Sequence, residues 1–395
     1  MTAENPAVDG RTALPTRTPG DAGAGGAEPG SGPLPGHAGL GGRTGSPGYT
    51  ASPGHAGAGG AEPERALSGH ASSGGHTASP GHAPGHASAD GAEPGSVLLP
   101  GHDVPLGRYT TVRRLLPQRP RRMVGAWCFV DHFGPEDVNG RPGMQIPPHP
   151  HTGLQTVTWL AEGEILHRDS LGNIQPIAPG QLNLMTAGHG IAHSEHSPPE
   201  RPPTMHGLQL WIALPDEARH GEARFEHHAA LPALRDGDVT VTVVVGEAGP
   251  LRSPARVHTP LLGAEVLFTG PGAHRLPVDW SYETAVLAMS GTADVAGVAL
   301  APGSLLYLGV GRTEIPIEAA GPARLFVLGG TPFEEPLVMW WNFVGRSHEE
   351  IARARDDWMR GERFGVVPGG ERPLPAPDMP MVRLKARDRH GRILG

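Results

Sequence analysis

Two short segments of the chain pair potential metal ligands at a spacing of two residues. The first is the run PHPH at residues 148–151, and the second is the run HSE at residues 193–195. On a β-strand, residues i and i+2 point to the same face with backbones about 6.6 Å apart, a fair spacing for two ligands of one ion. Each pair alone is weak evidence in a chain with 22 histidines, because two partly buried, hydrogen-bonded side chains would leave the same pattern.

The two pairs gain weight from their shared context. Gly143 precedes the first pair, and Gly188 and Gly190 precede the second. Because glycine has no side chain, the backbone at these positions can come close to an ion. If both segments are inward-facing strands of one barrel, three neutral nitrogens and one carboxylate converge. This donor set suits Fe(II), Mn(II), Ni(II) or Zn(II) and leaves two octahedral positions open. The predicted ligands are His149, His151, His193 and Glu195.

Further polar residues flank these pairs. His167 and Asp169 lie in the strand expected after the first pair, where they either contact a substrate and orient a metal-bound histidine or form a solvent-facing strand edge. His189 is either a hydrogen-bonding neighbour of the ligands or a surface turn residue, and the same holds for His196. His132, within an apolar run, is expected to be a core histidine.

The surrounding sequence favours an all-β fold. From Val97 onward, short alternating apolar runs are broken by Gly, Pro, Asn and Asp every eight to twelve residues or so, the rhythm of sandwiches and barrels. One barrel is expected over 97–214, a linker over 215–236 and a second barrel over 237–365. A capping box of Ser347 and Glu350 predicts one late helix that ends at Gly361.

The two ends of the chain have a different composition. Residues 1–96 are rich in Gly, Pro, Ala and His and carry one aromatic residue, Tyr49, so we expect a disordered tail. Its histidines either scavenge metal or reflect slippage of a low-complexity repeat. Residues 366–395 are Pro-rich and then basic, and a flexible tail is expected there.

Charge and cysteine content exclude several classes of protein. The net charge is −8 and Lys385 is the single lysine, so we expect no direct binding of nucleic acid. Cys128 is the single cysteine, which excludes an intramolecular disulfide and any Cys-based zinc or iron–sulfur site. No signal peptide and no apolar run of membrane-spanning length is visible, so a cytoplasmic protein without membrane contact is expected.

Five separated motifs in this order resemble the pirin family. They are WCFVDHFGP, PHPHTGLQTVTWLAEGEILHRDSLGN, MTAGHGIAHSEHS, GLQLWIALP and GGTPFEEP. The resemblance spans roughly Val97 to Gly365 and implies two tandem cupin (jelly-roll) β-barrels. It also implies that iron binds in the N-terminal barrel alone, through the two histidines of HPH and the His and Glu of HSE. Many relatives carry Glu where this chain has Gln155, so a ligand role at that position is not expected.

The resemblance implies a dioxygenase that opens quercetin-type flavonols with O₂ on a non-haem Fe(II) ion. Glu195 would take the substrate proton. Mn, Ni, Zn or Cu could replace iron, with one ion per chain in a monomer. A small aromatic substrate needs an apolar wall, for which the candidates, equally suited to a barrel core, are Trp159, Leu184, Met185 and Trp211.

Two other functions remain open at this stage. Pirins also act as metal-dependent regulators, so the alternative is a protein that binds a transcription or metabolic enzyme partner without catalysis. A purely structural, closed four-coordinate zinc site is the third hypothesis.

Overall fold

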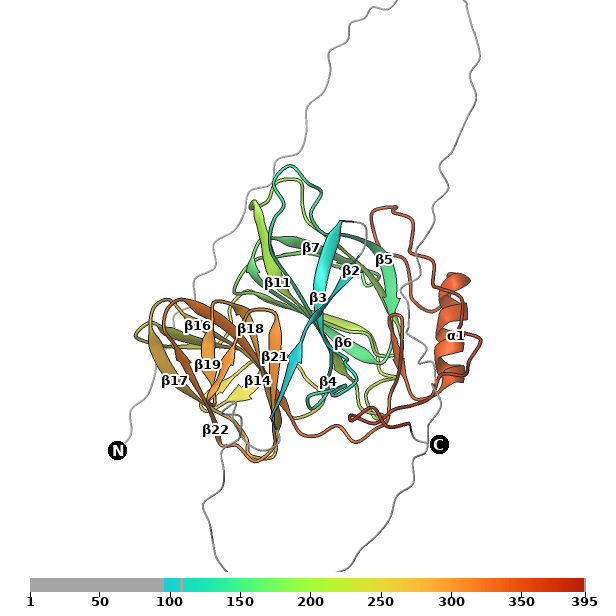
Figure 1. Cartoon of the computed structure of the whole chain (residues 1–395). Coiled ribbons are helices and arrows are strands. Elements are labelled where there is room, and N and C mark those ends of the chain that lie inside the picture. The colour runs from blue at the N-terminus through green and yellow to red at the C-terminus, as the bar shows by residue number, and fades with distance from the viewer. Residues whose placement is uncertain (1–95, 107–108, 394–395) are drawn as a thin grey trace, which may run out of the picture. The chain divides into compact units, whose positions relative to one another are not determined.

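The computed structural model describes residues 96–106 and 109–393. The Gly/Pro/Ala/His-rich segment up to residue 95 and its histidines lie outside this range. The described residues belong to one compact unit and form two β-barrels followed by a helix, as expected from the alternating apolar runs (Figure 1). No helix among these residues is both long and apolar enough to cross a membrane.

The N-terminal barrel consists of two sheets. The larger sheet has the order β12-β9-β6-β11-β4-β3-β2. Its strands are β2 (His102–Leu106), β3 (Thr110–Leu116), β4 (Trp127–Asp137), β6 (Leu154–Glu162), β9 (Leu182–Thr186), β11 (Thr204–Ala213) and β12 (Arg224–His228). The smaller sheet has the order β5-β10-β7-β8. Its strands are β5 (Gln145–His151), β7 (Ile165–Asp169), β8 (Ile174–Ile177) and β10 (Ile191–His196).

The C-terminal barrel repeats this plan. Its larger sheet has the order β1-β21-β18-β23-β16-β14-β13, with β15 paired to β14. The strands are β1 (Val97–Pro100), β13 (Ala233–Asp236), β14 (Val239–Ala248), β15 (Leu251–Arg252), β16 (Leu261–Phe268), β18 (Glu283–Ser290), β21 (Ser304–Gly309) and β23 (Ala323–Gly330). The smaller sheet, β17-β22-β19-β20, contains β17 (Gly272–Pro277), β19 (Ala293–Val295), β20 (Val298–Leu300) and β22 (Glu314–Ala319).

Two strands pair with a barrel other than the one, or the linker, in which the sequence places them. Strand β1 pairs with β21 at the edge of the C-terminal barrel, although it precedes the N-terminal barrel in the chain. Strand β12, inside the segment expected to be a linker, pairs with β9 of the N-terminal barrel. In both cases the backbone of the segment forms hydrogen bonds with a strand at the edge of a sheet. A local sequence pattern predicts a strand but does not specify its partner.

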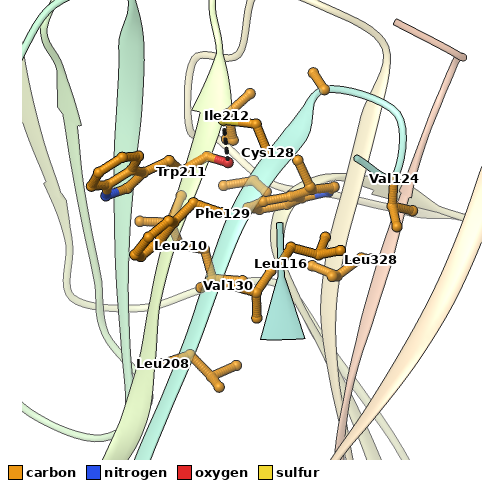
Figure 2. Close-up of a cluster of buried hydrophobic side chains, with 14 of the residues drawn as sticks. Leu116, Val124, Cys128, Phe129, Val130, Leu208, Leu210, Trp211, Ile212 and Leu328 are labelled. Carbon is orange, nitrogen blue, oxygen red and sulfur yellow. Dashed lines mark hydrogen bonds between the residues drawn. The ribbon is translucent and has the colours of Figure 1, made fainter. Parts of the chain in front are cut away.

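One hydrophobic cluster contains side chains from both barrels. Trp127 and Phe129 of β4 share it with Phe326 and Leu328 of β23. Figure 2 shows Leu328 close to Leu116 and Val130 of the N-terminal barrel. Cys128 lies in the same cluster, its thiol donates to the Trp211 carbonyl at 3.6 Å, and burial raises its pKa to about 12. The thiol is therefore buried and protonated, as expected.

The chain ends in a hairpin, a helix and an extended segment. The hairpin is formed by β24 (Val338–Trp340) and β25 (Phe343–Gly345), and the helix is α1 (His348–Met359). The Ser347 hydroxyl accepts from the Glu350 amide, which confirms the predicted N-cap. Beyond the helix, the segment expected to be a flexible tail is hydrogen-bonded at several places, including Leu374 N to the Pro148 carbonyl at 2.8 Å.

Candidate metal centre

Three histidines converge between β5 and β10. His149 and His151 end β5, and His193 lies on the antiparallel neighbour β10, directly opposite His149. All three side chains are buried, and one ring nitrogen of each lies within 4.8 Å of the others. This is the one group of three or more potential ligands that gathers in this way among the residues the structure describes. The alternation of the two strands therefore brings together the three nitrogens expected from the sequence.

The tautomers of His149 and His151 follow from their hydrogen bonds. The Nδ1 of His149 lies 2.9 Å from the Pro147 carbonyl, and the Nδ1 of His151 lies 3.1 Å from the Asn342 carbonyl. A carbonyl can only accept, so each Nδ1 must carry the hydrogen. Burial lowers the pKa of His149 to about 4 and that of His151 well below its usual value. Both rings are thus neutral, and each has a free lone pair on Nε2.

A hydrogen-bonded chain sets the tautomer of His193. The Asp169 carboxylate lies 3.1 Å from Nε2 of His167, so this nitrogen must be the donor. In the neutral form of His167, Nδ1 is the acceptor, and it accepts from Nδ1 of His193 at 3.4 Å. Burial lowers the pKa of His193 well below its usual value. His193 is therefore left with its lone pair on Nε2, as in the other two histidines.

Asp169 is itself held firmly. Its carboxylate accepts from the backbone amides of Leu171 and Asn173 and from the Asn173 side chain. Burial alone would raise the pKa of Asp169, but the hydrogen bonds from His167 and Asn173 outweigh this effect and hold it below the usual value. The carboxylate is thus charged and orients His167. Both side chains are buried, so they do not form a solvent-facing strand edge, and their role toward a metal-bound histidine stays a prediction.

The lone pairs make this cluster fit a divalent metal ion. The Nε2 atoms of His151 and His193 lie 3.1 Å apart, and neither carries a hydrogen in the tautomers derived above. Two facing lone pairs repel one another unless a cation lies between them. Two nitrogens at right angles around an ion, each at about 2.1 Å, lie about 3.0 Å apart. The spacing of 3.1 Å is therefore compatible with two ligands of one ion.

Glu195 lies on the same face of β10 as His193 but outside the group of three histidines. Its side chain is buried, and the Thr158 hydroxyl lies 3.3 Å from Oε1. Burial raises the pKa of Glu195. Glu195 as a fourth ligand stays a prediction, and its position also suits a residue that accepts a proton beside the ion.

Gln155 and His189 are placed differently from the ligand histidines. The Gln155 amide is buried on β6 and donates to Thr186 Oγ1 and to the Arg256 carbonyl, both at 2.9 Å. Its Oε1 is buried and has no hydrogen-bond partner among the described residues. His189 is exposed in the turn before β10, and the centroid of its ring lies 6.3 Å from that of His220. His132 is a core histidine, as expected, and hydrogen-bonds to His206 at 2.9 Å.

Two residues that contact histidines of the centre were not predicted from the sequence. Asn342 approaches His151 because the hairpin β24–β25 packs against the end of β5. A Cβ at Gly153, where φ is +69°, would lie 2.2 Å from the Val344 carbonyl, so glycine permits this approach. Phe225 of β12 stacks on the His167 ring at 4.4 Å. Neither contact has a local signal, because both partners are distant in sequence.

The apolar surroundings of the centre come partly from the side chains expected to form a substrate wall. Trp211 meets the His151 ring edge-on at 5.2 Å and stacks on Phe129 at 4.1 Å. The other three candidates are buried in the shared hydrophobic cluster: Trp159, Leu184 and Met185. Trp211 and Phe225 therefore place aromatic rings against His151 and His167, respectively.

Two tandem cupin barrels, the first carrying three converging histidines, define a bicupin with a candidate metal centre. A family model described as pirin matches residues 109–212, and one described as the pirin C-terminal cupin domain matches residues 265–365. The chain belongs to the pirin family.

Relatives and a solved structure agree with this membership. A Pseudomonas aeruginosa protein, provisionally named quercetin 2,3-dioxygenase, is 47% identical over 277 residues, which cover 70% of this chain and 88% of that protein. Human pirin is 31% identical over 252 residues, covering 62% of this chain and 84% of the human protein. The crystal structure of a quercetin 2,3-dioxygenase from Acinetobacter baumannii matches with a TM-score of 0.69 at 42% identity, covering 73% of this chain and 97% of that one.

Proposed function

We propose that this protein is an iron-dependent dioxygenase that opens quercetin-type flavonols with O₂. The observation that carries the proposal is the set of three buried histidines, one ring nitrogen of each within 4.8 Å of the others, with Nε2 of His151 and Nε2 of His193 only 3.1 Å apart. The names of the Pseudomonas and Acinetobacter relatives agree with this substrate class. A bound Fe(II) ion would supply Lewis acidity and the redox chemistry that a reaction with O₂ requires.

The residues around the histidines would take on three roles. Glu195, with its raised pKa, would accept the proton of the flavonol hydroxyl as the substrate binds. Trp211 and Phe225 would offer aromatic faces to a flat ring system. Oε1 of Gln155, which has no hydrogen-bond partner in the part of the chain that the structure describes, would accept from a phenolic hydroxyl.

The test is turnover of quercetin by the full chain loaded with Fe(II) in air, followed by loss of the flavonol absorption and by O₂ uptake. His193→Ala should lose both the metal and turnover. Glu195→Gln should lower turnover by about 100-fold or more, because the proton acceptor is gone. His274→Ala, in the C-terminal barrel, is the matched control and should leave both readouts unchanged.

Other outcomes would point to the other functions. Metal retained without turnover on a panel of flavonoids would contradict the proposal and favour a metal-dependent regulator of a protein partner. A closed four-coordinate zinc ion without bound water, found by metal analysis and spectroscopy, would favour a structural site.

A further inference from the structure

A cleft lies on the outer face of the sheet that carries the histidines. Strand β10 alternates, so that His193 and Glu195 face the barrel interior while Ser194 and His196 face outward. The cleft has a volume of about 670 Å³ and is bounded by this outer face and by residues 368–371 of the C-terminal segment. Volumes of about 300–1,000 Å³ are typical of small-molecule sites.

Proline rings form most of the apolar part of the cleft wall. They come from the loop before β5, from β5, from the turn after β10 and from the C-terminal segment: Pro142, Pro148, Pro198, Pro199 and Pro368. Proline rings are rigid and apolar, so they form a preformed surface for a flat hydrophobic group with little loss of side-chain entropy. Leu166, opposite His196 on β7, adds to this surface.

One cation in the cleft, Arg168, has no side-chain partner among the residues that the structure describes. The guanidinium of Arg168, opposite Ser194 on β7, forms no hydrogen bond or ion pair with any residue in the described ranges 96–106 and 109–393. Arg201 also lines the cleft, but its terminal nitrogens are bound to backbone carbonyls, among them Pro198 at 2.8 Å and Val138 at 3.1 Å. Arg168 is therefore the group left to pair with an anion.

The protein itself places a carboxylate in this cleft. Glu371 of the C-terminal segment lies 3.0 Å from Nε2 of His196, and its side chain is 44% exposed. This contact shows that a carboxylate fits against the outer face of β10. The Glu371 carboxylate contacts His196 and not Arg168, so the guanidinium of Arg168 can pair with a second carboxylate.

We propose that this cleft binds a small aromatic carboxylate, with its ring against the proline wall and its carboxylate on Arg168. Arginine pairs with a carboxylate through two parallel N–H···O bonds, which orients a planar acid. The site is separate from the histidine cluster, because it lies on the opposite face of the same strands. A ligand here contacts Ser194 and His196, the two neighbours of Glu195 in β10.

The test is calorimetric titration of the full chain with benzoate, with benzyl alcohol as the uncharged analogue. Benzoate should bind saturably, and benzyl alcohol should bind at least about tenfold more weakly, because the charged hydrogen bonds are absent. Arg168→Gln should weaken benzoate at least about tenfold. Arg235→Gln removes the same charge from an exposed position on β13 and should leave the affinity unchanged.

Two more variants locate the site. Glu371→Gln should strengthen benzoate binding about two- to fivefold, because a like charge leaves the cleft. His193→Ala should leave benzoate binding unchanged even if flavonol turnover is lost. Equal benzoate affinity in Arg168→Gln and the wild-type chain would overturn the proposal, as would binding that disappears in His193→Ala or no saturable binding at all. Circular dichroism of each variant confirms that the fold is retained.

Discussion

At the scale of single residues, the candidate metal centre depends on which nitrogen of each imidazole carries the hydrogen. Three different acceptors determine this: the Pro147 carbonyl, the Asn342 carbonyl and the chain from His167 to Asp169. The two carbonyls accept directly from Nδ1–H of His149 and His151, and Asp169 acts on Nδ1–H of His193 through the ring of His167. In each ligand histidine the lone pair is therefore on Nε2. Such outer contacts orient ligands and raise their basicity. The centre is therefore larger than its three histidines.

The first prediction concerns Asp169. Asp169→Asn should weaken divalent-metal binding by about 10- to 100-fold, because an amide cannot supply the charge that holds His167 and, through it, His193. Competition against a chromogenic chelator measures the affinity. Asp294→Asn makes the same change on an exposed residue of the C-terminal barrel and should have no effect. Equal affinities in the two variants would show that the chain from Asp169 to His193 does not support the centre.

At the scale of elements, each barrel contains a strand that the chain order would place elsewhere. Strand β12 brings Phe225 onto His167, and β1 extends the C-terminal sheet. Strands β4 and β11 are joined by more than their backbones, because the buried His132 and His206 share a hydrogen bond of 2.9 Å between Nε2 atoms. Only one of two such nitrogens can donate, so at most one ring can be charged while this bond exists.

The second prediction is a loss of stability in acid caused by this pair. Burial lowers the pKa of His132 from 6.5 to about 3 and that of His206 from 6.5 to about 4. Between pH 6.5 and 4 the unfolded chain thus binds more protons than the folded one. The contribution of the pair to stability is complete above pH 6.5 and declines as the pH falls, by up to about 1.4 kcal/mol per pH unit for each histidine.

Urea unfolding at pH 7 and pH 5 tests this dependence. The wild-type chain should lose more unfolding free energy between these two values than the double variant His132→Leu/His206→Leu. The difference between the two chains isolates the pair from other titrating groups. An identical loss in both chains would mean that neither imidazole is held neutral by the fold.

At the scale of the whole molecule, a buried carboxylate joins three distant parts of the chain. Glu283 of the C-terminal barrel accepts from the Gly125 amide at 2.9 Å and from Tyr307 at 3.0 Å. It also pairs with Arg121 of the N-terminal barrel and with Arg389 of the C-terminal segment. Its side chain is fully buried, so these contacts are screened little by solvent.

The third prediction follows from that burial. Glu283→Ala should lower the free energy of unfolding by about 3–5 kcal/mol, because two largely buried arginines lose a fully buried counter-charge. Glu314→Ala breaks an ion pair with Arg275 whose side chains are 44% and 69% exposed, and it should cost less than about 1 kcal/mol. Denaturant unfolding with matched slopes measures both. Similar costs for the two variants would contradict a buried clamp at Glu283.

Local periodicity was enough to predict much of this protein. Alternation of side chains along a strand is a property of neighbouring residues, so the sequence alone determined the two barrels, the capped helix and the shared face of His149 and His151. The convergence of His193 with them needed the pairing of β5 with β10, which the strand pattern and family motifs anticipated.

Only the tertiary structure decided the rest. Asn342 lies 191 residues from His151, and the partners of β1 and β12 are equally unmarked in the local sequence. These contacts result from sheet edges and hairpins that meet in space. Their stability comes from burial and hydrogen bonding between segments distant in the chain, which no window of neighbouring residues contains. The sequence thus specified the nitrogens of the candidate centre, and the fold specified their tautomers.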